Sequence, residues 1–454
     1  MRTYDCIVIG TGSAGNQAAY KFAEKGLRVA IVENFTPGGT CAQRGCDAKK
    51  ILLTGSETKD AVERLLGYGV KGLISIDWRQ LMERKNEYTR AIPEQTRKRY
   101  AETDIDYFHG EPRFVSSHRL RIGEEEIEGK QFLIATGLRP RELTVPGSER
   151  FITSNEFLEL KDLPRRLVCI GGGYISFEFA HLARIAGADV TIVLRSDPLK
   201  QFESELVDVL LDATRALGIS IIKEAEVVAY EEDSLRLSNG DVLKTDVVLN
   251  ATGRVASIDQ LGLEAIGVSH NEKGIHVNAY LQSSVEHIYA AGDVAVSGNP
   301  ALTPFAGTEG RLAADNMLEG NNRKLELLPV PSVVFTAPNL ALVGETEAAL
   351  KKAGIPYRGR LIDTSSWQTN ARIKDSFARA KVLVGEDDQV LGAHFIGVNA
   401  AELANYFSFA MQHRIPSTSM QQTGFAYPTP ASDIASLFEV RRRSPSIRVK
   451  TCNS

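Results

Sequence analysis

Two of the five cysteines, Cys41 and Cys46, are separated by four residues in the segment Gly-Gly-Thr-Cys-Ala-Gln-Arg-Gly-Cys. Thiols at this spacing can close a small disulfide if the chain turns between them. A helical pattern over about 47–66 follows, with Lys49 and Lys50 near its start. A helix N-terminus and nearby lysines favour a thiolate, so the pattern predicts a redox-active pair. The alternatives are two small buried thiols or half of a zinc site, although no matching Cys/His pair lies nearby.

A glycine-rich turn precedes the thiol segment and must help to position it. The apolar residues 4–9 predict a buried strand, which leads through Gly-Thr-Gly-Ser-Ala-Gly into a helix over 16–25 and a second strand over 28–32. This is the full context of a dinucleotide-binding fingerprint, in which the turn approaches a pyrophosphate and an acid accepts from a ribose hydroxyl. The residues predicted to bind the nucleotide are Gly10, Gly12, Gly15 and Glu33.

The same pattern returns later in the chain. An apolar segment over 167–170 leads into Gly-Gly-Gly-Tyr-Ile-Ser, a helix to Ala186 and a strand over 190–194. Ser176 replaces the usual small third residue, so the second fingerprint is the weaker of the two. A tight turn without ligand is the alternative for either copy. The predicted ligands here are Gly171 and Gly173.

A further repeat supports two nucleotide-binding units, because Ala-Thr-Gly closes an apolar segment at both Gly137 and Gly253. From Pro331 onward, strand-like segments over 381–385 and 390–398 and a helix over 400–413 suggest an α+β unit. We therefore predict an α/β fold with two Rossmann-like nucleotide-binding domains and a C-terminal α+β domain. The predicted boundaries are 1–149 with 257–328 for the first domain, 150–256 for the second and 329–454 for the third.

Length and composition narrow the classes of function. A chain of 454 residues with 43% hydrophobic and 24% charged residues is an ordinary globular protein. The net charge of -4 gives no electrostatic case for a nucleic-acid partner. No apolar run approaches a membrane span, and the N-terminus lacks a signal-peptide pattern. The odd number of widely spaced cysteines favours a reducing compartment, so we expect a cytoplasmic protein without a metal site or membrane partner.

Together these motifs resemble the class I pyridine nucleotide-disulfide oxidoreductases, the family of glutathione reductase, lipoamide dehydrogenase and mercuric reductase. The likeness spans almost the whole chain. Besides the fingerprints and the thiol segment, it includes Tyr-Ala-Ala-Gly-Asp at 289–293, Leu-Thr-Pro at 302–304 and the opening of a dimerisation domain at 331–345.

The resemblance implies FAD in the first nucleotide-binding unit, with Asp293 on its ribityl chain. It places Cys46 beside the flavin and Cys41 toward the substrate, with Lys49 and Glu178 as an ion pair near the flavin. Tyr174 matches the residue that gates the nicotinamide pocket. Asp293 taken alone would more often be a helix cap, so its role depends on the resemblance. Further cofactor-binding positions implied by the match are Thr40, Lys49, Thr136, Gly137, Gly253 and Thr303.

The expected nicotinamide follows from a comparison of the two fingerprints, position by position. Glu33 lies 23 residues after Gly10, and the same offset from Gly171 ends at Leu194, which is followed by Arg195. With no acid at the ribose position, Arg195 and the nearby Lys200 suit a 2′-phosphate, so we expect NADPH rather than NADH. The alternative is a solvated basic loop.

The sequence departs from the family near its C-terminus. Most disulfide-reducing members carry His-Pro-Thr and, five residues after the His, a Glu; the two form an acid-base dyad. Here Tyr427 stands for the His and Ser432 for the Glu, while Asp433 comes one residue late. A phenol titrates near pH 10, so Tyr427 could donate a hydrogen bond but would be a poor base at neutral pH. The alternative is that Tyr427 is an aromatic residue of an interface without a catalytic role.

Three further features are unusual for the family. Asp47 replaces an apolar residue beside Cys46, either as a helix cap or as a carboxylate that opposes the thiolate. The basic tail over 441–450 ends near a single Cys452, which could relay electrons. No clear site for the carboxylates of glutathione is evident, because the helix after the first glycine turn carries Asn16 and Gln17 rather than arginines.

The leading hypothesis is a homodimeric FAD enzyme that uses NADPH to reduce the Cys41–Cys46 disulfide and then a small disulfide substrate. A mercuric-type reductase is the first alternative, since that branch also has Tyr at the His position. The others are a transhydrogenase or quinone diaphorase, in which the flavin reacts directly, and a non-enzymatic flavoprotein sensor.

Overall fold

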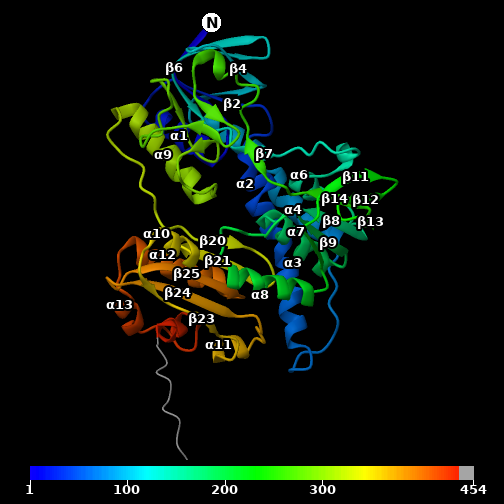
Figure 1. Cartoon of the computed structure of the whole chain (residues 1–454). Helices are drawn as coiled ribbons and strands as arrows, with labels where there is room; N and C mark the ends of the chain where they lie inside the picture. Colours follow the sequence, from blue (N-terminus) through cyan, green and yellow to red (C-terminus); the bar gives the residue numbers. More distant parts are fainter. Residues whose placement is uncertain (439–454) are drawn as a thin grey trace, which may run out of the picture. The chain divides into compact units, whose positions relative to one another are not determined.

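The structure is a computed structural model that describes residues 1–438, and the predicted basic tail and Cys452 lie outside the described residues. The chain divides into two compact units (Figure 1). The N-terminal unit comprises residues 1–199 and 212–328. The C-terminal unit comprises residues 200–211 and the chain from Pro329 onward. Within the described residues, no helix is both long and apolar enough to cross a membrane.

The first nucleotide-binding region of the N-terminal unit is built on a seven-stranded sheet. Its order is β3-β2-β1-β6-β5-β4. The seventh strand, β18, also pairs with β6, at residues 132–134. Strands β1, β2, β3, β6 and β18 run parallel, whereas β4 and β5 add an antiparallel extension. The bounds are β1 (Arg2–Ile9), β2 (Val29–Glu33), β3 (Ile105–His109), β4 (Pro112–Ser116), β5 (Arg119–Ile122), β6 (Glu125–Ile134) and β18 (Ile288–Ala290).

Helices pack on this sheet because its central strands are apolar on both faces. Helix α1 lies beside α9 (Figure 1), and the two bury Ala14, Ala18, Ala313 and Ala314 with the sheet. Small side chains at this crossing let the two backbones approach closely. The helices of this part are α1 (Ser13–Glu24), α2 (Gly39–Arg44), α3 (Cys46–Leu65), α4 (Trp78–Arg90), α5 (Ile92–Glu102) and α9 (Thr303–Glu319).

The second nucleotide-binding region has a four-stranded parallel sheet in the order β10-β9-β8-β14. Its strands are β8 (Arg166–Ile170), β9 (Asp189–Leu194), β10 (Ser220–Lys223) and β14 (Val247–Asn250). Its helices are α6 (Ser154–Phe157), α7 (Tyr174–Ala186) and α8 (Ser204–Ala216), of which α8 is divided between the two compact units.

Short strands complete the N-terminal unit. Strands β7 (Leu138–Pro140) and β15 (Arg254–Ala256) pair where the chain leaves and re-enters the first region. The remaining strands are β11 (Val227–Glu231), β12 (Ser234–Leu237), β13 (Val242–Lys244), β16 (His270–Asn271), β17 (Gly274–His276) and β19 (Ala295–Val296).

The two nucleotide-binding regions close in the same way. Gly10 has φ +106°, and a Cβ there would lie 2.4 Å from the carbonyl oxygen of Ala135. Gly171 has φ +121°, and a Cβ there would lie 2.3 Å from the carbonyl oxygen of Ala251. Only glycine tolerates both the conformation and the approach. Each Ala-Thr-Gly segment therefore closes its own glycine turn, as the repeat predicted.

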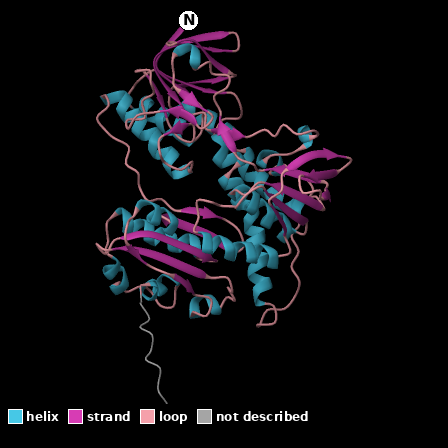
Figure 2. Ribbon diagram, in the orientation of Figure 1, coloured by secondary structure: helices cyan, strands magenta, loops and turns pink. Residues whose placement is uncertain are grey.

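The C-terminal unit is an α+β structure built on a six-stranded sheet, with the order β20-β21-β25-β24-β22 and β23 also paired to β24. Helix α12 packs on β25 and β21, and Figure 2 shows helices over this sheet. Its elements are β20 (Ser332–Val334), β21 (Asn339–Gly344), α10 (Glu347–Ala353), β22 (Tyr357–Arg358), β23 (Leu361–Asp363), α11 (Gln368–Ala371), β24 (Arg379–Gly385), β25 (Val390–Gly397), α12 (Ala400–Gln412), α13 (Ser417–Gln422) and α14 (Ile434–Leu437).

A buried lysine joins two distant segments of the C-terminal unit. Lys381 on β24 is 2% exposed, and its Nζ lies 2.9 Å from Glu203 Oε1 and 2.5 Å from Glu205 Oε2. It also contacts the carboxylate of Glu347. Burying a charged ammonium is costly unless it is paired, so these carboxylates fix residues 203–205 against the sheet.

Candidate active site

The two cysteines occupy a tight turn at the start of α3. Helix α2 carries Cys41, Gly45 follows it, and Cys46 is the first residue of α3. A Cβ on Gly45 would lie 3.1 Å from Cys41 Cα, which shows how closely the turn folds back. Both thiols are free in this structure. Thr303 at the start of α9 contacts both, with Oγ1 3.2 Å from Cys41 Sγ and 3.8 Å from Cys46 Sγ.

The two thiols differ in acidity. A hydrogen bond from the Cys41 thiol, and then the charge of Lys49, lower the pKa of the Cys46 thiol to about 6 despite opposing burial. The same hydrogen bond and burial raise the pKa of Cys41. At neutral pH the reduced pair therefore holds a Cys46 thiolate beside a protonated Cys41. A thiolate at this position is the form able to return electrons or attack a disulfide.

The ion pair expected beside the flavin is formed. Lys49 Nζ lies 2.5 Å from Glu178 Oε2, and both residues are buried. Lys49 lies one turn along α3 from Cys46, whereas Glu178 comes from α7 of the second nucleotide-binding region. The pair thus connects the thiol helix to the region in which the nicotinamide is expected.

The first glycine turn has room for the pyrophosphate of a dinucleotide. No atom lies within 4 Å of the Cβ position at Gly12 or at Gly137. At Gly15, by contrast, a Cβ would lie 2.0 Å from the carbonyl oxygen of Gly10, so α1 packs directly on the turn. Glu33 Oε2 accepts hydrogen bonds from Thr11 Oγ1 at 2.6 Å and Thr11 N at 3.1 Å, which fixes its carboxylate beside the turn.

Two further polar groups fit a bound flavin nucleotide. The hydroxyl of Thr136 is buried and has no hydrogen-bond partner among the described residues. Asp293 follows β18 in the turn before β19, and burial raises the pKa of its carboxyl group. It does not cap a helix, since the N-cap residue of α9 is Leu302. A buried hydroxyl without a partner among the described residues and a half-buried carboxyl group are what a ligand with many hydroxyl groups would satisfy.

The second glycine turn is also open, because no atom lies within 4 Å of a Cβ at Gly173 or Gly253. Tyr174 is the first residue of α7 and is 40% exposed. Burial raises the pKa of its phenol to about 12. The phenol of Tyr174 therefore remains neutral, and its expected gating of the nicotinamide pocket stays a prediction.

The two residues expected to bind a phosphate are assigned to different compact units. Arg195 follows β9, and 79% of its side chain is exposed. Its Nε lies 3.7 Å from Glu226 Oε1. Glu226 comes later in the chain than the position 23 residues after Gly171, so the sequence comparison did not identify this carboxylate. Lys200 is grouped with the C-terminal unit, so its expected part in nucleotide binding stays a prediction. Thr40 lies within α2 directly before Cys41, and its expected part likewise stays a prediction.

A cavity of about 470 Å³ opens beside Thr303. Thr303 and Gly38 line it, and Thr303 is the residue that hydrogen bonds to Cys41. Arg99 from α5 and Arg311 from α9 also line it, and none of the lining residues, all within the described chain, carries a carboxylate. The others are Ser13, Asn16, Gln17, Tyr20, Ile92, Gln95, Thr96, Pro304 and Gly307.

Both guanidinium groups are fixed by neutral partners. Arg311 Nη1 donates to Gln17 Oε1 at 3.1 Å, and Nη2 donates to Thr308 Oγ1 at 3.3 Å. The guanidinium of Arg99 lies 5.9 Å from the ring centroid of Tyr20. Neutral partners leave the positive charge of both arginines for an anionic ligand.

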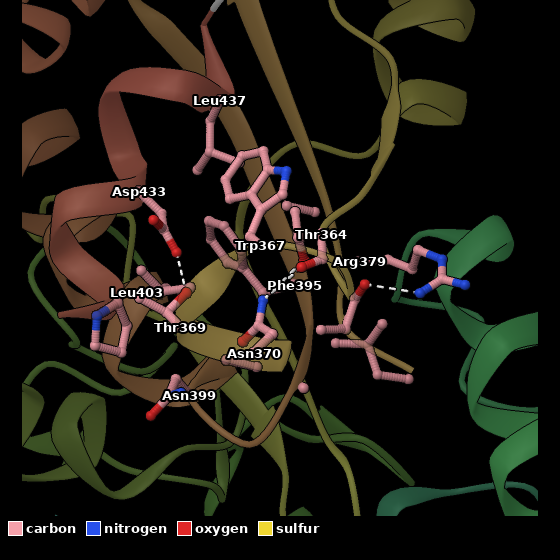
Figure 3. A pocket seen from close by; sticks show the side chains of 16 residues that line it. Thr364, Trp367, Thr369, Asn370, Arg379, Phe395, Asn399, Leu403, Asp433 and Leu437 are labelled. Carbon is pink, nitrogen blue, oxygen red and sulfur yellow. Dashed lines mark hydrogen bonds between the residues drawn. The ribbon is translucent and has the colours of Figure 1, made fainter. Parts of the chain in front are cut away.

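The residues in place of the family's acid-base dyad do not form a dyad. Tyr427 is 79% exposed. The hydroxyl of Ser432 donates to the carbonyl oxygen of Thr429 at 2.6 Å. The carboxyl group of Asp433 faces the hydroxyl of Thr369 in a separate cavity of about 30 Å³, large enough for little more than a water molecule (Figure 3). Burial raises the pKa of Asp433.

We expect Tyr427→Phe to reduce the steady-state rate by less than about a hundred-fold, the lower end of the loss on removing a general acid-base group. The phenol is exposed and has no hydrogen-bonded base among the described residues. The measurement is kcat against pH with a saturating disulfide. A loss of several powers of ten, with one limb of the pH profile missing, would identify Tyr427 as the acid-base residue.

Asp47 does not cap the helix that follows the thiols, so this one of the two interpretations of Asp47 is wrong. The N-cap position of α3 is Gly45, and Asp47 lies inside the first turn. Its Oδ2 is 3.5 Å from the hydroxyl of Tyr88 on α4. Its negative charge raises the pKa of Cys41. The main influences on Cys46 are instead Cys41, burial and Lys49.

We therefore expect Asp47→Asn to lower the pKa of Cys41, because a negative charge opposes ionisation of a neighbouring thiol. The measurement is the rate of iodoacetamide alkylation at Cys41 against pH in the reduced protein. Tyr88→Phe keeps the carboxylate and is the control, which should match the parent profile. A larger change at Cys46 than at Cys41 would contradict this assignment and favour the tuning of the flavin-side thiol.

Sequence reasoning missed the arginines of the cavity. The first helix carries Asn16 and Gln17, whereas Arg99 lies on α5 and Arg311 on the third turn of α9. The position of Arg311 eight residues after Thr303 was an available signal, since this spacing on a helix places both side chains near one face. Nothing in the sequence marks Arg99 or Glu226 in this way.

Family models and known proteins match most of the chain. Residues 4–310 match the family model described as pyridine nucleotide-disulphide oxidoreductase, and residues 330–437 match the dimerisation domain of that family. A glutathione reductase of Nostoc sp. is 33% identical, covering 96% of this chain and 99% of the relative. A mercuric reductase of Staphylococcus aureus is 31% identical, covering 95% of this chain and 81% of the relative.

A solved structure shares the whole architecture. The HOCl-induced flavoprotein disulfide reductase RclA of Escherichia coli superposes with a TM-score of 0.86 at 26% identity. The match covers 97% of this chain and 100% of that one. The same Escherichia coli protein has also been solved as a Cu(II) complex.

Proposed function

The chain belongs to the pyridine nucleotide-disulphide oxidoreductase family, and we propose that it is an NADPH-dependent reductase of a small, negatively charged disulfide. Membership makes it an FAD-dependent flavoprotein disulfide reductase with a C-terminal dimerisation domain. The proposal adds the substrate class, the nicotinamide and a homodimer that the dimerisation domain would form.

The observation that carries the substrate class is the cavity beside Thr303. It contains two guanidinium groups and no carboxylate among its lining residues, all within the described chain. Its volume of about 470 Å³ suits a small ligand. A disulfide bearing two or more carboxylates could place them on Arg99 and Arg311 while its sulfur atoms approach Cys41.

In the proposed thiol chemistry Cys41 is the thiol that faces the substrate, as the family resemblance implies, and Cys46 is the thiolate that resolves the mixed disulfide. Cys41, on releasing its proton, attacks one substrate sulfur; the substrate S–S bond breaks, and the departing thiolate takes up a proton. The Cys46 thiolate then attacks Cys41 Sγ, which forms the Cys41–Cys46 disulfide and releases the second half of the substrate as a thiolate that takes up a proton from solvent. When bound, FAD supplies the transfer of two electrons from the nicotinamide to this disulfide. In total, NADPH, one proton and the disulfide give NADP⁺ and two thiols.

NADPH is proposed because Arg195 follows the second strand of its nucleotide-binding region where an NAD-binding acid would stand. The exposed guanidinium can pair with a 2′-phosphate. Glu226 opposes this, since its carboxylate competes for the same cation. The preference for NADPH should therefore be moderate, and loss of Glu226 should increase it.

A second candidate acceptor is a soft metal ion. A mercuric reductase is among the relatives, and RclA has been solved with Cu(II). Cys46 is exposed in this structure, so the thiol pair itself could bind such an ion. The lining of the cavity within the described chain, however, includes neither Cys nor His, the ligands that soft ions prefer. This observation favours the disulfide.

The deciding experiment compares disulfides of different charge. We expect kcat/KM to be highest for glutathione disulfide, lower for neutral hydroxyethyl disulfide and lowest for cationic cystamine. Arg99→Gln and Arg311→Gln should each raise KM for the anionic disulfide about ten-fold, the value of one charge-assisted hydrogen bond. Hydroxyethyl disulfide should be nearly unaffected.

Arg97→Gln is the matched control, because Arg97 lies on the same helix as Arg99 but faces Tyr107 and Glu94 rather than the cavity. Equal rates for all three disulfides would contradict an anionic substrate. Titration of thiols after anaerobic NADPH reduction tests the chemistry itself. Two new thiols per subunit support the disulfide or metal reductase, and none would favour the diaphorase or the sensor.

A further inference from the structure

Glu309 is a buried carboxylate that neither the thiol chemistry nor nucleotide binding explains. It lies on α9 and is 2% exposed. No lysine, arginine or histidine in the described part of the chain forms an ion pair with it. A buried carboxylate without a cation must be stabilised by hydrogen-bond donors.

Three donors come from the segment 292–299, which follows β18 and contains β19. Gly292 N donates to Glu309 Oε2 at 2.9 Å. Ser297 Oγ donates to Oε1 at 2.6 Å, and Asn299 Nδ2 donates to the same oxygen at 3.0 Å. One side chain of α9 therefore holds both ends of the segment 292–299, which contains Asp293.

The backbone of this turn has little freedom. Gly292 has φ +76°, and its carbonyl oxygen accepts from Ala295 N at 2.8 Å. With Gly292 N bound to Glu309, both polar groups of this residue are fixed by the protein. The side chain of Asp293 therefore leaves the backbone in a defined direction.

Helix α9 is equally constrained on its other side. A Cβ on Gly310 would lie 2.2 Å from the carbonyl oxygen of Ala14 on α1, so the two helices cross in direct contact. The same helix begins at Thr303, whose hydroxyl contacts both thiols. A change in the position of α9 relative to the turn would therefore alter Thr303 and the flavin-side turn together.

We propose that Glu309 is a positioning residue that sets the register of α9 against the flavin-binding turn, and so fixes Asp293 and Thr303 relative to each other. The inference depends on FAD binding, which the family shares, and not on the identity of the disulfide. In this proposal, the buried side chain of Glu309 keeps the flavin-binding turn aligned with the thiol pair.

The test compares Glu309→Ala and Glu309→Gln in the full chain. We expect Glu309→Ala to raise the Kd of the apoprotein for FAD at least about ten-fold, because the turn loses three hydrogen bonds. In the FAD-loaded protein, the pH midpoint for alkylation of Cys46 should rise, because Thr303 is one of the groups that lower the Cys46 pKa. Glu309→Gln should restore part of both losses, since its amide oxygen can accept from Gly292 N and its amide NH2 can donate to Ser297 Oγ, whereas the hydrogen bond from Asn299 Nδ2 is lost.

Glu319→Ala is the matched control, an exposed glutamate at the end of the same helix that should leave both readouts unchanged. If Glu309→Ala does not fold, Glu309→Asp keeps the charge but shortens the reach, and should raise the FAD Kd several-fold. A lower melting temperature with FAD Kd and Cys46 midpoint both within two-fold of the parent would overturn the proposal. Equal losses in Glu309→Gln and Glu309→Ala would overturn it as well.

Discussion

Replacing Cys46 with serine is expected to abolish disulfide reduction while reduction of the flavin by NADPH persists. The hydride enters at the nicotinamide side, whereas every electron that reaches a disulfide substrate must pass through the thiol pair. Without Cys46 no internal disulfide can form to resolve the mixed disulfide on Cys41, so the steady-state rate should fall by at least about a thousand-fold. Stopped-flow absorbance of the flavin and turnover with glutathione disulfide measure the two steps.

Cys169→Ala is the control for this prediction. Cys169 is fully buried on β8, and burial raises the pKa of its thiol, so it is not expected to exchange electrons. Cys41→Ser should keep the Cys46 thiolate and its long-wavelength absorbance with the flavin, lost as the pH falls through the Cys46 pKa. Undiminished turnover in both active-site variants would instead support direct reaction of the acceptor with the flavin.

Reversing the charge at Arg195 should have the next largest effect. Arg195→Glu removes the cation that we propose pairs with the 2′-phosphate, and it places a second carboxylate beside Glu226. A charge-assisted hydrogen bond and a new repulsion together should raise KM for NADPH about a hundred-fold, and KM for NADH little. Initial rates with each nicotinamide, at saturating disulfide, measure the change.

Glu226→Gln is the complementary variant, since it removes the competing carboxylate and leaves Arg195 in place. Its KM for NADPH should fall below that of the parent. Equal changes for the two nicotinamides in Arg195→Glu would mean that the arginine is part of a solvated loop and does not recognise the phosphate.

Most of the scaffold could be predicted from the sequence because its signals are local. The helix after the thiols was expected over about 47–66 and is found at Cys46–Leu65. The strand expected over 390–398 is found at Val390–Gly397. In each case periodicity, glycine turns and segment length point to the same element.

The site could be predicted where a motif fixes it. Lys49 and Glu178 lie 129 residues apart in the chain, and only the family resemblance suggested that they meet. The cavity is harder to predict from the sequence. Arg99 and Arg311 come from two helices that are distant in the chain, and no sequence motif or repeat indicates that they line the same cavity. Glu309 gives a similar lesson, since a glutamate on a helix suggests exposure until the turn from 292 to 299 supplies its donors.

The buried lysine of the C-terminal unit has a consequence for recombining this chain with its relatives. Residues 200–211 belong by contact to the C-terminal unit, and Glu203 and Glu205 in this segment share Lys381 with Glu347. A chimera that joins a foreign dimerisation domain at residue 329 would separate the lysine from two of its carboxylates. The exchangeable module is therefore discontinuous, and a hybrid protein should inherit the segment 200–211 from the same parent as the C-terminal sheet.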